Sequence, residues 1–237
     1  MTQTADLHFY FDPVCPFAWM TSKWVRMVAA QRDYQVDWRF ISLRQVNAHI
    51  DYDSHFPVGY DAGHTAGLHL LRVAAAVRSE HGRNAVGPLY EAFGERIFQV
   101  DEQPKPETYD ELARSALAQA GLPEQLADAR GDSSWDAEIQ AESDLALSLT
   151  GKDVGTPILH VQPPDGVAFF GPVISRLPSE QEAVELWDHV LGLARFAGFA
   201  ELKRSLRERP QLPAFGVPAG GAGETEDWHG GSRRPKK

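Results

Sequence analysis

The chain has 237 residues, of which 43% are hydrophobic and 24% charged, and its formal net charge is -10. This composition is typical of a globular protein with a full core, and the acidic balance excludes the basic face of a nucleic-acid binder. No apolar run is long enough to span a bilayer, and residues 1–6 lack the basic and apolar regions of a signal peptide. We therefore expect a cytoplasmic protein with no nucleic-acid and no membrane partner.

The chain opens with a strand, a helix and a strand. Apolar and polar residues alternate in Leu7–Asp12 and again in Val36–Ile41, which is the pattern of a strand. Between them, apolar residues recur at helical spacing from Phe17 to Gln31. This order predicts two parallel strands joined by a right-handed crossover.

A helical region follows, from about Ala62 to Thr150, without a strong strand signal. Thr108 and Glu111 have the spacing of a capping box. Helices are predicted here at Leu68–Ser79, Pro88–Phe98, from Thr108 to Gly121, Leu122–Arg130 and Ser134–Thr150.

Strands return at Ile158–Val161 and Val167–Phe170, and the proline- and glycine-containing turn between them predicts a hairpin. A second capping box, Ser179 with Glu182, starts a helix expected to run to about Ala197. Residues 199–209 are expected to continue as helix.

The fold class expected from this order is α/β, a thioredoxin-like fold with an inserted all-helical domain. The strand–helix–strand opening and the final hairpin and helix supply the core, and the helical region interrupts it. The expected boundaries are a thioredoxin-like domain at 1–58 and 151–209, a helical insertion at 59–150, and a largely disordered tail at 210–237, which is rich in proline, glycine and charge.

Cys15 is the only cysteine, so the chain cannot form an internal disulfide. A lone cysteine is most often a small buried apolar side chain. Here it follows a strand and precedes Pro16, a residue suited to the first helical position, so Cys15 is expected at the N-cap. The free N–H groups and the dipole of a helix start stabilise a thiolate, and can lower a thiol pKa from about 8.5 to roughly 3.5–7.5. We therefore expect a reactive cysteine.

The dipeptide Thr156-Pro157 directly precedes the first strand of the hairpin. X–Pro bonds are the usual location of cis peptides, although only about 5–6% of them are cis. Alone, the dipeptide would be an ordinary helix-to-strand connector. Together with a cysteine at a helix start, it suggests a loop that faces the cysteine and holds an incoming thiol-bearing chain as an added strand.

Several motifs in order resemble the DsbA family of thiol–disulfide oxidoreductases, and in particular the actinobacterial mycothiol-dependent reductases, known as the mycothiol-dependent nitroreductase group. The resemblance extends over about residues 7–209. It is carried by Phe11–Trp19, Gly87–Tyr90, Asp153–Val161, Val167–Val173 and Glu185–Asp188.

The resemblance implies a thiol-dependent oxidoreductase in which Cys15 is the nucleophile. Mycothiol, or another low-molecular-weight thiol, would be the co-substrate, with no tightly bound cofactor, and the second partner would be a disulfide or an electrophile. A homodimer is left open. The residues expected to bind the thiol or substrate are Pro16, Phe17, Trp19, Asn47, Gly155, Thr156 and Pro157, with Phe17 and Trp19 as the apolar wall of a cleft.

One departure affects the mechanism, because Ala18 stands where redox-active relatives have a second cysteine. Cys15 would then have to exchange with an external thiol, as in a monothiol scheme. Two alternatives stay open. One is a kappa-type glutathione transferase or isomerase, in which serine usually occupies the position of Cys15, and the other is a redox-inactive binding protein.

Four histidines, His49, His55, His64 and His69, lie close in the sequence at spacings of 6, 9 and 5. These spacings match no metal motif, so no metal site is expected and the histidines are interpreted as solvated loop residues. His160 is interpreted as structural, and the tyrosine-containing loop at 51–61 as a surface loop.

Overall fold

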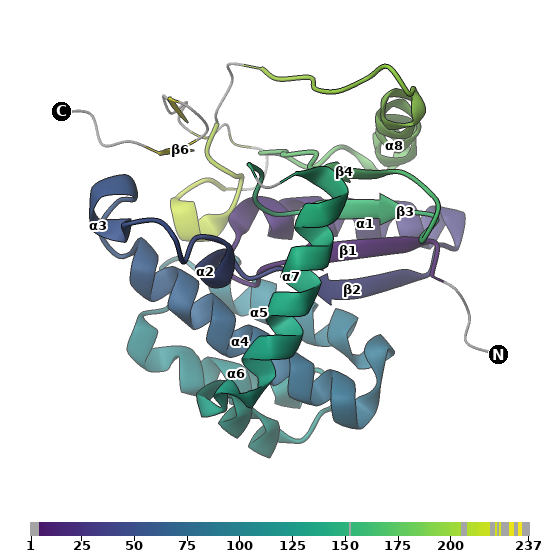
Figure 1. Cartoon of the computed structure of the whole chain (residues 1–237). Helices are drawn as coiled ribbons and strands as arrows, with labels where there is room; N and C mark the ends of the chain where they lie inside the picture. The colour runs from purple at the N-terminus through teal and green to yellow at the C-terminus, as the bar shows by residue number, and fades with distance from the viewer. Residues whose placement is uncertain are drawn as a thin grey trace.

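A four-stranded sheet forms the centre of the computed structural model, which describes residues 5–151, 153–204, 208–218, 221, 223, 228–229 and 232–233. The strand order is β2-β1-β3-β4, with β1 parallel to β2 and antiparallel to β3, and β3 antiparallel to β4 (Figure 1). The bounds are Leu7–Phe11 for β1, Val36–Phe40 for β2, Ile158–Val161 for β3 and Ala168–Phe170 for β4.

Helices cover both faces of this sheet. In the view of Figure 1, α7 crosses in front of the sheet, α1 lies behind it, and α4, α5 and α6 form a bundle below it. None of the helices in the described residues is both long and apolar enough to cross a membrane. The bounds are α1 Pro16–Arg32, α2 Leu43–Val46, α3 Tyr52–His55, α4 Tyr60–His81, α5 Val86–Phe98, α6 Tyr109–Gln119, α7 Asp136–Thr150 and α8 Glu180–Arg195.

Aromatic side chains join the layers of the core. Trp24 of α1 packs on Trp187 of α8, and its indole N–H donates to the Ala183 carbonyl at 2.9 Å. On the other side, Phe11 of β1 stacks on Tyr90 of α5 with ring centroids 3.8 Å apart. The first contact holds α1 against α8, and the second holds the end of β1 against the helical insertion. Cys15 lies between β1 and α1, so both contacts fix its position.

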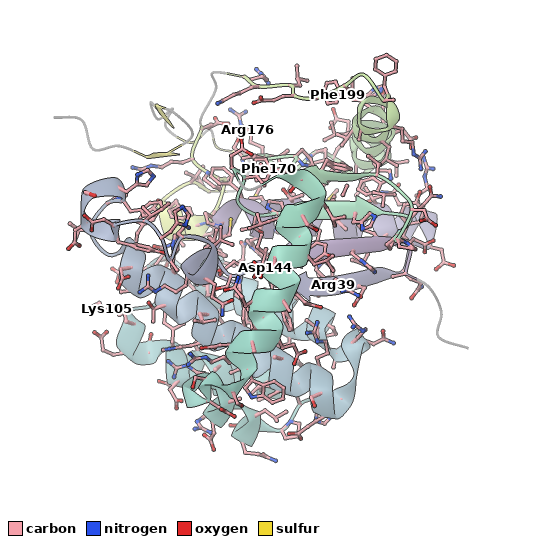
Figure 2. All side chains as sticks on the ribbon, viewed as in Figure 1. Arg39, Lys105, Asp144, Phe170, Arg176 and Phe199 are labelled. Carbon is pink, nitrogen blue, oxygen red and sulfur yellow. The ribbon has the colours of Figure 1, made fainter. Side chains whose placement is uncertain are left out.

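A buried carboxylate, Glu142 of α7, joins the helical insertion to the sheet. It accepts hydrogen bonds from the Phe40 backbone N–H at 2.9 Å and from the Arg78 guanidinium at 2.9 Å. Arg39 of β2, labelled beside α7 in Figure 2, lies 3.3 Å from the same carboxylate. One side chain therefore connects β2, α4 and α7.

Gly94 lets α5 approach α1 closely. A Cβ at this position would lie 2.2 Å from the Trp19 ring. We expect Gly94→Ala to lower the free energy of unfolding by about 1–3 kcal/mol, the usual cost of overpacking, measured by urea denaturation. The control is Gly192→Ala in α8, where a Cβ would meet nothing within 4 Å. This change should instead stabilise by about 0.4–1 kcal/mol, and equal effects at the two positions would contradict the packing argument.

Most of the predicted elements are confirmed, including the thioredoxin-like fold with a helical insertion, the hairpin, and the capping box of Ser179 and Glu182. Two local predictions are wrong, and one predicted helix is present as a different helix type. Thr108 makes no side-chain cap, since it ends a short 3-10 turn. The segment Glu124–Gly131 is a 3-10 helix. Residues 199–204 are not helical, because they are largely exposed and no apolar face is buried to stabilise a helix there.

Part of the expected disordered tail is packed on the domain. Leu212 is fully buried, and the Gln211 N–H donates to the Ser175 carbonyl at 2.7 Å. Phe215 contacts Phe98 at the end of α5. The expectation of disorder is therefore wrong for residues 210–218, because their apolar side chains find partners on the body of the protein. Most of the remaining tail lies outside the described residues.

Candidate active site

Cys15 is the N-cap residue of α1, as the sequence predicts. Its backbone is extended, with φ -83° and ψ 111°, and Pro16 occupies the first position of the helix. The Cys15 sulfur accepts a hydrogen bond from the Ala18 backbone N–H at 3.4 Å. The sulfur thus takes the place that a serine or aspartate oxygen holds in an ordinary helix cap.

The Thr156-Pro157 loop lies directly against this sulfur, and its peptide bond is cis. The Cys15 thiol lies 3.5 Å from the Thr156 carbonyl oxygen, to which it donates. The Thr156 hydroxyl donates to the Tyr10 carbonyl at 3.1 Å and so holds the loop against β1. Two segments that are 141 residues apart in the sequence are brought together here.

Burial of the Cys15 sulfur favours the neutral thiol over the thiolate. Cys15 is only 7% exposed, and burial raises its pKa to about 12, while the backbone N–H groups of Ala18 and Phe17 lower it and the carboxylate of Asp12 raises it. The expectation of a lowered pKa is therefore wrong, because the cost of burying a charged sulfur exceeds the stabilisation that the helix start provides.

This raised pKa predicts an unusual pH profile for the alkylation of Cys15 by iodoacetamide. Below the pKa the thiolate fraction grows about tenfold per pH unit, so the rate should still rise at about pH 10 without a plateau. The same protein in denaturant is the control, and its rate should level off above the ordinary thiol pKa of about 8.5. A plateau at neutral pH in the native protein would contradict the burial argument.

Sequence reasoning did not identify Asp12, which is fully buried at the end of β1. Its carboxylate accepts from the Val14 N–H at 3.1 Å and from the Leu43 N–H at 2.8 Å. Burial raises the pKa of Asp12 to about 7. Asp12 therefore ties the cysteine loop to the start of α2. An acidic residue placed between an apolar strand and a proline was the available signal in the sequence.

The other residues expected at the site do not all gather around the Cys15 sulfur. Trp19 is 2% exposed and packs in the core, so it cannot form the wall of an open cleft. Phe17 is partly buried. Asn47 ends α2, where its side-chain amide donates to the Leu43 carbonyl at 2.9 Å. Gly155 comes close to the Leu43 side chain, since a Cβ there would lie 3.9 Å from it.

The histidines of the helical insertion do not gather into a site. His64 is buried on α4, where its Nδ1 lies 3.0 Å from the Tyr52 hydroxyl, so its interpretation as a solvated loop residue is wrong. The segment around Tyr52 packs onto α4 and buries His64 there. Within the described ranges, no group of three or more His, Cys, Asp or Glu side chains is placed to hold a metal ion.

Comparisons with known proteins identify the family of this chain. Residues 14–204 match the Rv2466c-like family, described as mycothiol-dependent nitroreductase Rv2466c. A curated relative from Mycobacterium tuberculosis (strain ATCC 25618 / H37Rv), described as uncharacterized protein Rv2286c, is 30% identical over 207 residues, which cover 87% of this chain and 82% of the relative.

Among solved structures, a candidate protein disulfide isomerase from Nitrosomonas europaea is 14% identical, with a TM-score of 0.51. The match covers 79% of this chain and 99% of that chain, and it supports the fold alone. The resemblance that the motifs indicated is confirmed, and the chain belongs to the Rv2466c-like family of mycothiol-dependent nitroreductases.

Proposed function

We propose that this protein is a thiol-dependent reductase that exchanges disulfides through the single cysteine Cys15, with mycothiol as the co-substrate. The observation that supports it most is the position of the Cys15 sulfur, between the Ala18 N–H and the Thr156 carbonyl. Membership in a family described as mycothiol-dependent supports the choice of thiol.

The proposed exchange has two steps. The Cys15 thiolate attacks the mycothiol sulfur of a substrate mixed disulfide, forms a Cys15–mycothiol disulfide and releases the substrate as a thiolate. A free mycothiol thiolate then attacks that disulfide, which gives mycothiol disulfide and regenerates Cys15. In the whole cycle the mixed disulfide is reduced to the substrate thiol, and one free mycothiol is oxidised by pairing with the mycothiol unit taken from the substrate.

This scheme needs only one protein thiol. Cys15 is the only cysteine of the chain, and Ala18, one helical turn away, is fully buried and supplies no second sulfur. Because the Cys15 sulfur is nearly covered, the exchange also requires a local opening of the side chains above it. Opening would return water to the sulfur and lower its pKa toward the ordinary value.

A second candidate is a redox-inactive binding protein, and the burial of Cys15 favours it. A thiol whose pKa is raised to about 12 is a poor nucleophile at neutral pH. In that case the Thr156-Pro157 loop would bind an extended chain without covalent chemistry.

Incubation of the reduced protein with mycothiol disulfide, followed by intact-mass measurement, separates the two candidates. The reductase is expected to gain the mass of one mycothiol, and excess reduced mycothiol should remove it. Protein alkylated beforehand at Cys15 serves as the control. If no adduct forms even at about pH 9, where more of the thiol is ionised, the reductase proposal fails.

A further inference from the structure

The start of α1 is buried on every side. Successive residues of an α-helix point about 100° apart, so five in a row face all directions around the axis. Each residue of such a run is at most 2% exposed here, namely Ala18, Trp19, Met20, Thr21 and Ser22. A helix at a protein surface leaves one face in water, and residues 30–32 at the end of α1 do so. The outer side of the first turns therefore has a cover, which we trace to residues 208–217 and call the C-terminal strap.

One end of the C-terminal strap is anchored beside the second turn of α1. The Glu208 carboxylate accepts hydrogen bonds from the Ser175 hydroxyl at 2.8 Å and from Nε of Arg176 at 2.9 Å. These two partners follow Pro172, whose carbonyl accepts from the Thr21 hydroxyl of α1 at 2.7 Å. The strap therefore begins close to Thr21.

The other end of the strap lies level with the start of α1. Phe215 contacts Phe98, the last residue of α5, with ring centroids 6.4 Å apart. Helix α5 runs antiparallel to α1, because Arg26 donates to a carbonyl at the start of α5 at 2.8 Å, whereas Trp19 packs on Gly94 further along it. Phe98 is one turn beyond Gly94 and so lies level with the first turn of α1. In Figure 1 the yellow part of the strap lies at the end of the sheet where the arrow of β2 finishes.

Between its two ends the strap inserts apolar side chains into the core. Leu212 is fully buried, and Val217 is 6% exposed. Leu212 belongs to the same apolar cluster as Cys15 and Met20. The strap thus crosses the first turns of α1, on the side that neither the sheet nor α5 covers.

We propose that the C-terminal strap is a releasable cover of the Cys15 site, which shields the sulfur when docked and exposes it when detached. The inference goes beyond the proposed function, because it concerns access to the sulfur and holds for any reagent. The strap follows the last long helix and is no strand of the four-stranded sheet. Segments near a chain end that are held by few contacts detach at a much lower free energy than the whole domain unfolds.

The test measures the rate at which iodoacetamide alkylates Cys15 in the folded full-length protein. In this reaction the thiolate displaces iodide and forms a thioether, so the rate reports access to the sulfur. Two variants weaken the docking of the strap: Leu212→Ala removes its apolar anchor, and Glu208→Gln weakens its polar anchor. Leu202→Ala is the matched control, since Leu202 is 72% exposed and lies outside the strap.

Leu212→Ala is expected to react at least about tenfold faster than the wild type, because loss of a buried leucine favours the detached strap. Glu208→Gln should react about two- to fivefold faster, since one side of this ion pair is exposed. Leu202→Ala should react at the wild-type rate. If Leu212→Ala does not fold, the rate for Glu208→Gln decides alone.

Hydrogen exchange separates release of the strap from unfolding of the domain. The Gln211 N–H, which donates to a carbonyl outside the strap at 2.7 Å, should exchange faster in step with alkylation. The N–H of Leu159 in the central strand β3 should change far less. Unchanged alkylation in the anchor variants, or alkylation that rises only in step with exchange at Leu159, would overturn the strap. Faster alkylation without any mycothiol adduct would uphold the strap and reject the proposed function.

Discussion

Replacing Cys15 with serine is expected to abolish the mycothiol adduct and to lower thiol-exchange activity by about 10³-fold or more, as loss of a covalent nucleophile does in other enzymes. A serine hydroxyl cannot form the mixed disulfide. The serine hydroxyl can still accept a hydrogen bond from the Ala18 N–H, as the Cys15 sulfur does in the wild type. The helix cap should therefore survive. Intact mass after mycothiol disulfide treatment and a steady-state exchange assay measure the two effects.

The same variant tests the kappa-type alternative. Enzymes of that kind stabilise a thiolate that belongs to the co-substrate, so they need no protein cysteine at this position. Activity that survives Cys15→Ser would therefore assign the chain to that chemistry and reject the covalent scheme. The urea denaturation midpoint of Cys15→Ser is the folding control and should equal that of the wild type. An unchanged midpoint would show that any loss of activity comes from the missing sulfur.

Glu142→Ala is expected to lower the free energy of unfolding by about 3–5 kcal/mol, the cost of breaking a buried ion pair from one side. The change would leave the Arg78 guanidinium, bound at 2.9 Å, and the Phe40 N–H without this acceptor inside the protein. Urea denaturation followed by tryptophan fluorescence measures the loss.

The control for this prediction is Glu185→Ala on α8, whose side chain is 71% exposed and lies near His189 at 3.6 Å. It should change stability by less than about 0.5 kcal/mol, since exposed ion pairs contribute little. A joint replacement of Glu142 by leucine and Arg78 by methionine should recover part of the loss, because apolar pairs of similar size often replace buried ion pairs well. A loss below about 1 kcal/mol for Glu142→Ala would contradict the role of this carboxylate.

Features set by neighbouring residues were predictable from the sequence. The N-cap position of Cys15 follows from an alternating strand that ends before a proline and from Pro16 at the first helical position. The hairpin follows from its turn residues, and the start of α8 from the capping pair Ser179 and Glu182. The family resemblance also followed from the sequence, since short motifs near Cys15 and Pro157 carry it.

Burial was not predictable, because it depends on packing between segments far apart in the chain. The ionisation state of Cys15 depends on what covers the sulfur, and the helix start alone pointed to the opposite pKa shift. Trp19 has an ordinary helical pattern, yet its ring is enclosed because Gly94 of another helix leaves room for it. Leu212 lies in a proline- and glycine-rich stretch and is buried all the same. Local sequence sets which backbone shape each segment prefers, whereas solvent exclusion and charge depend on neighbours that only the folded chain brings together.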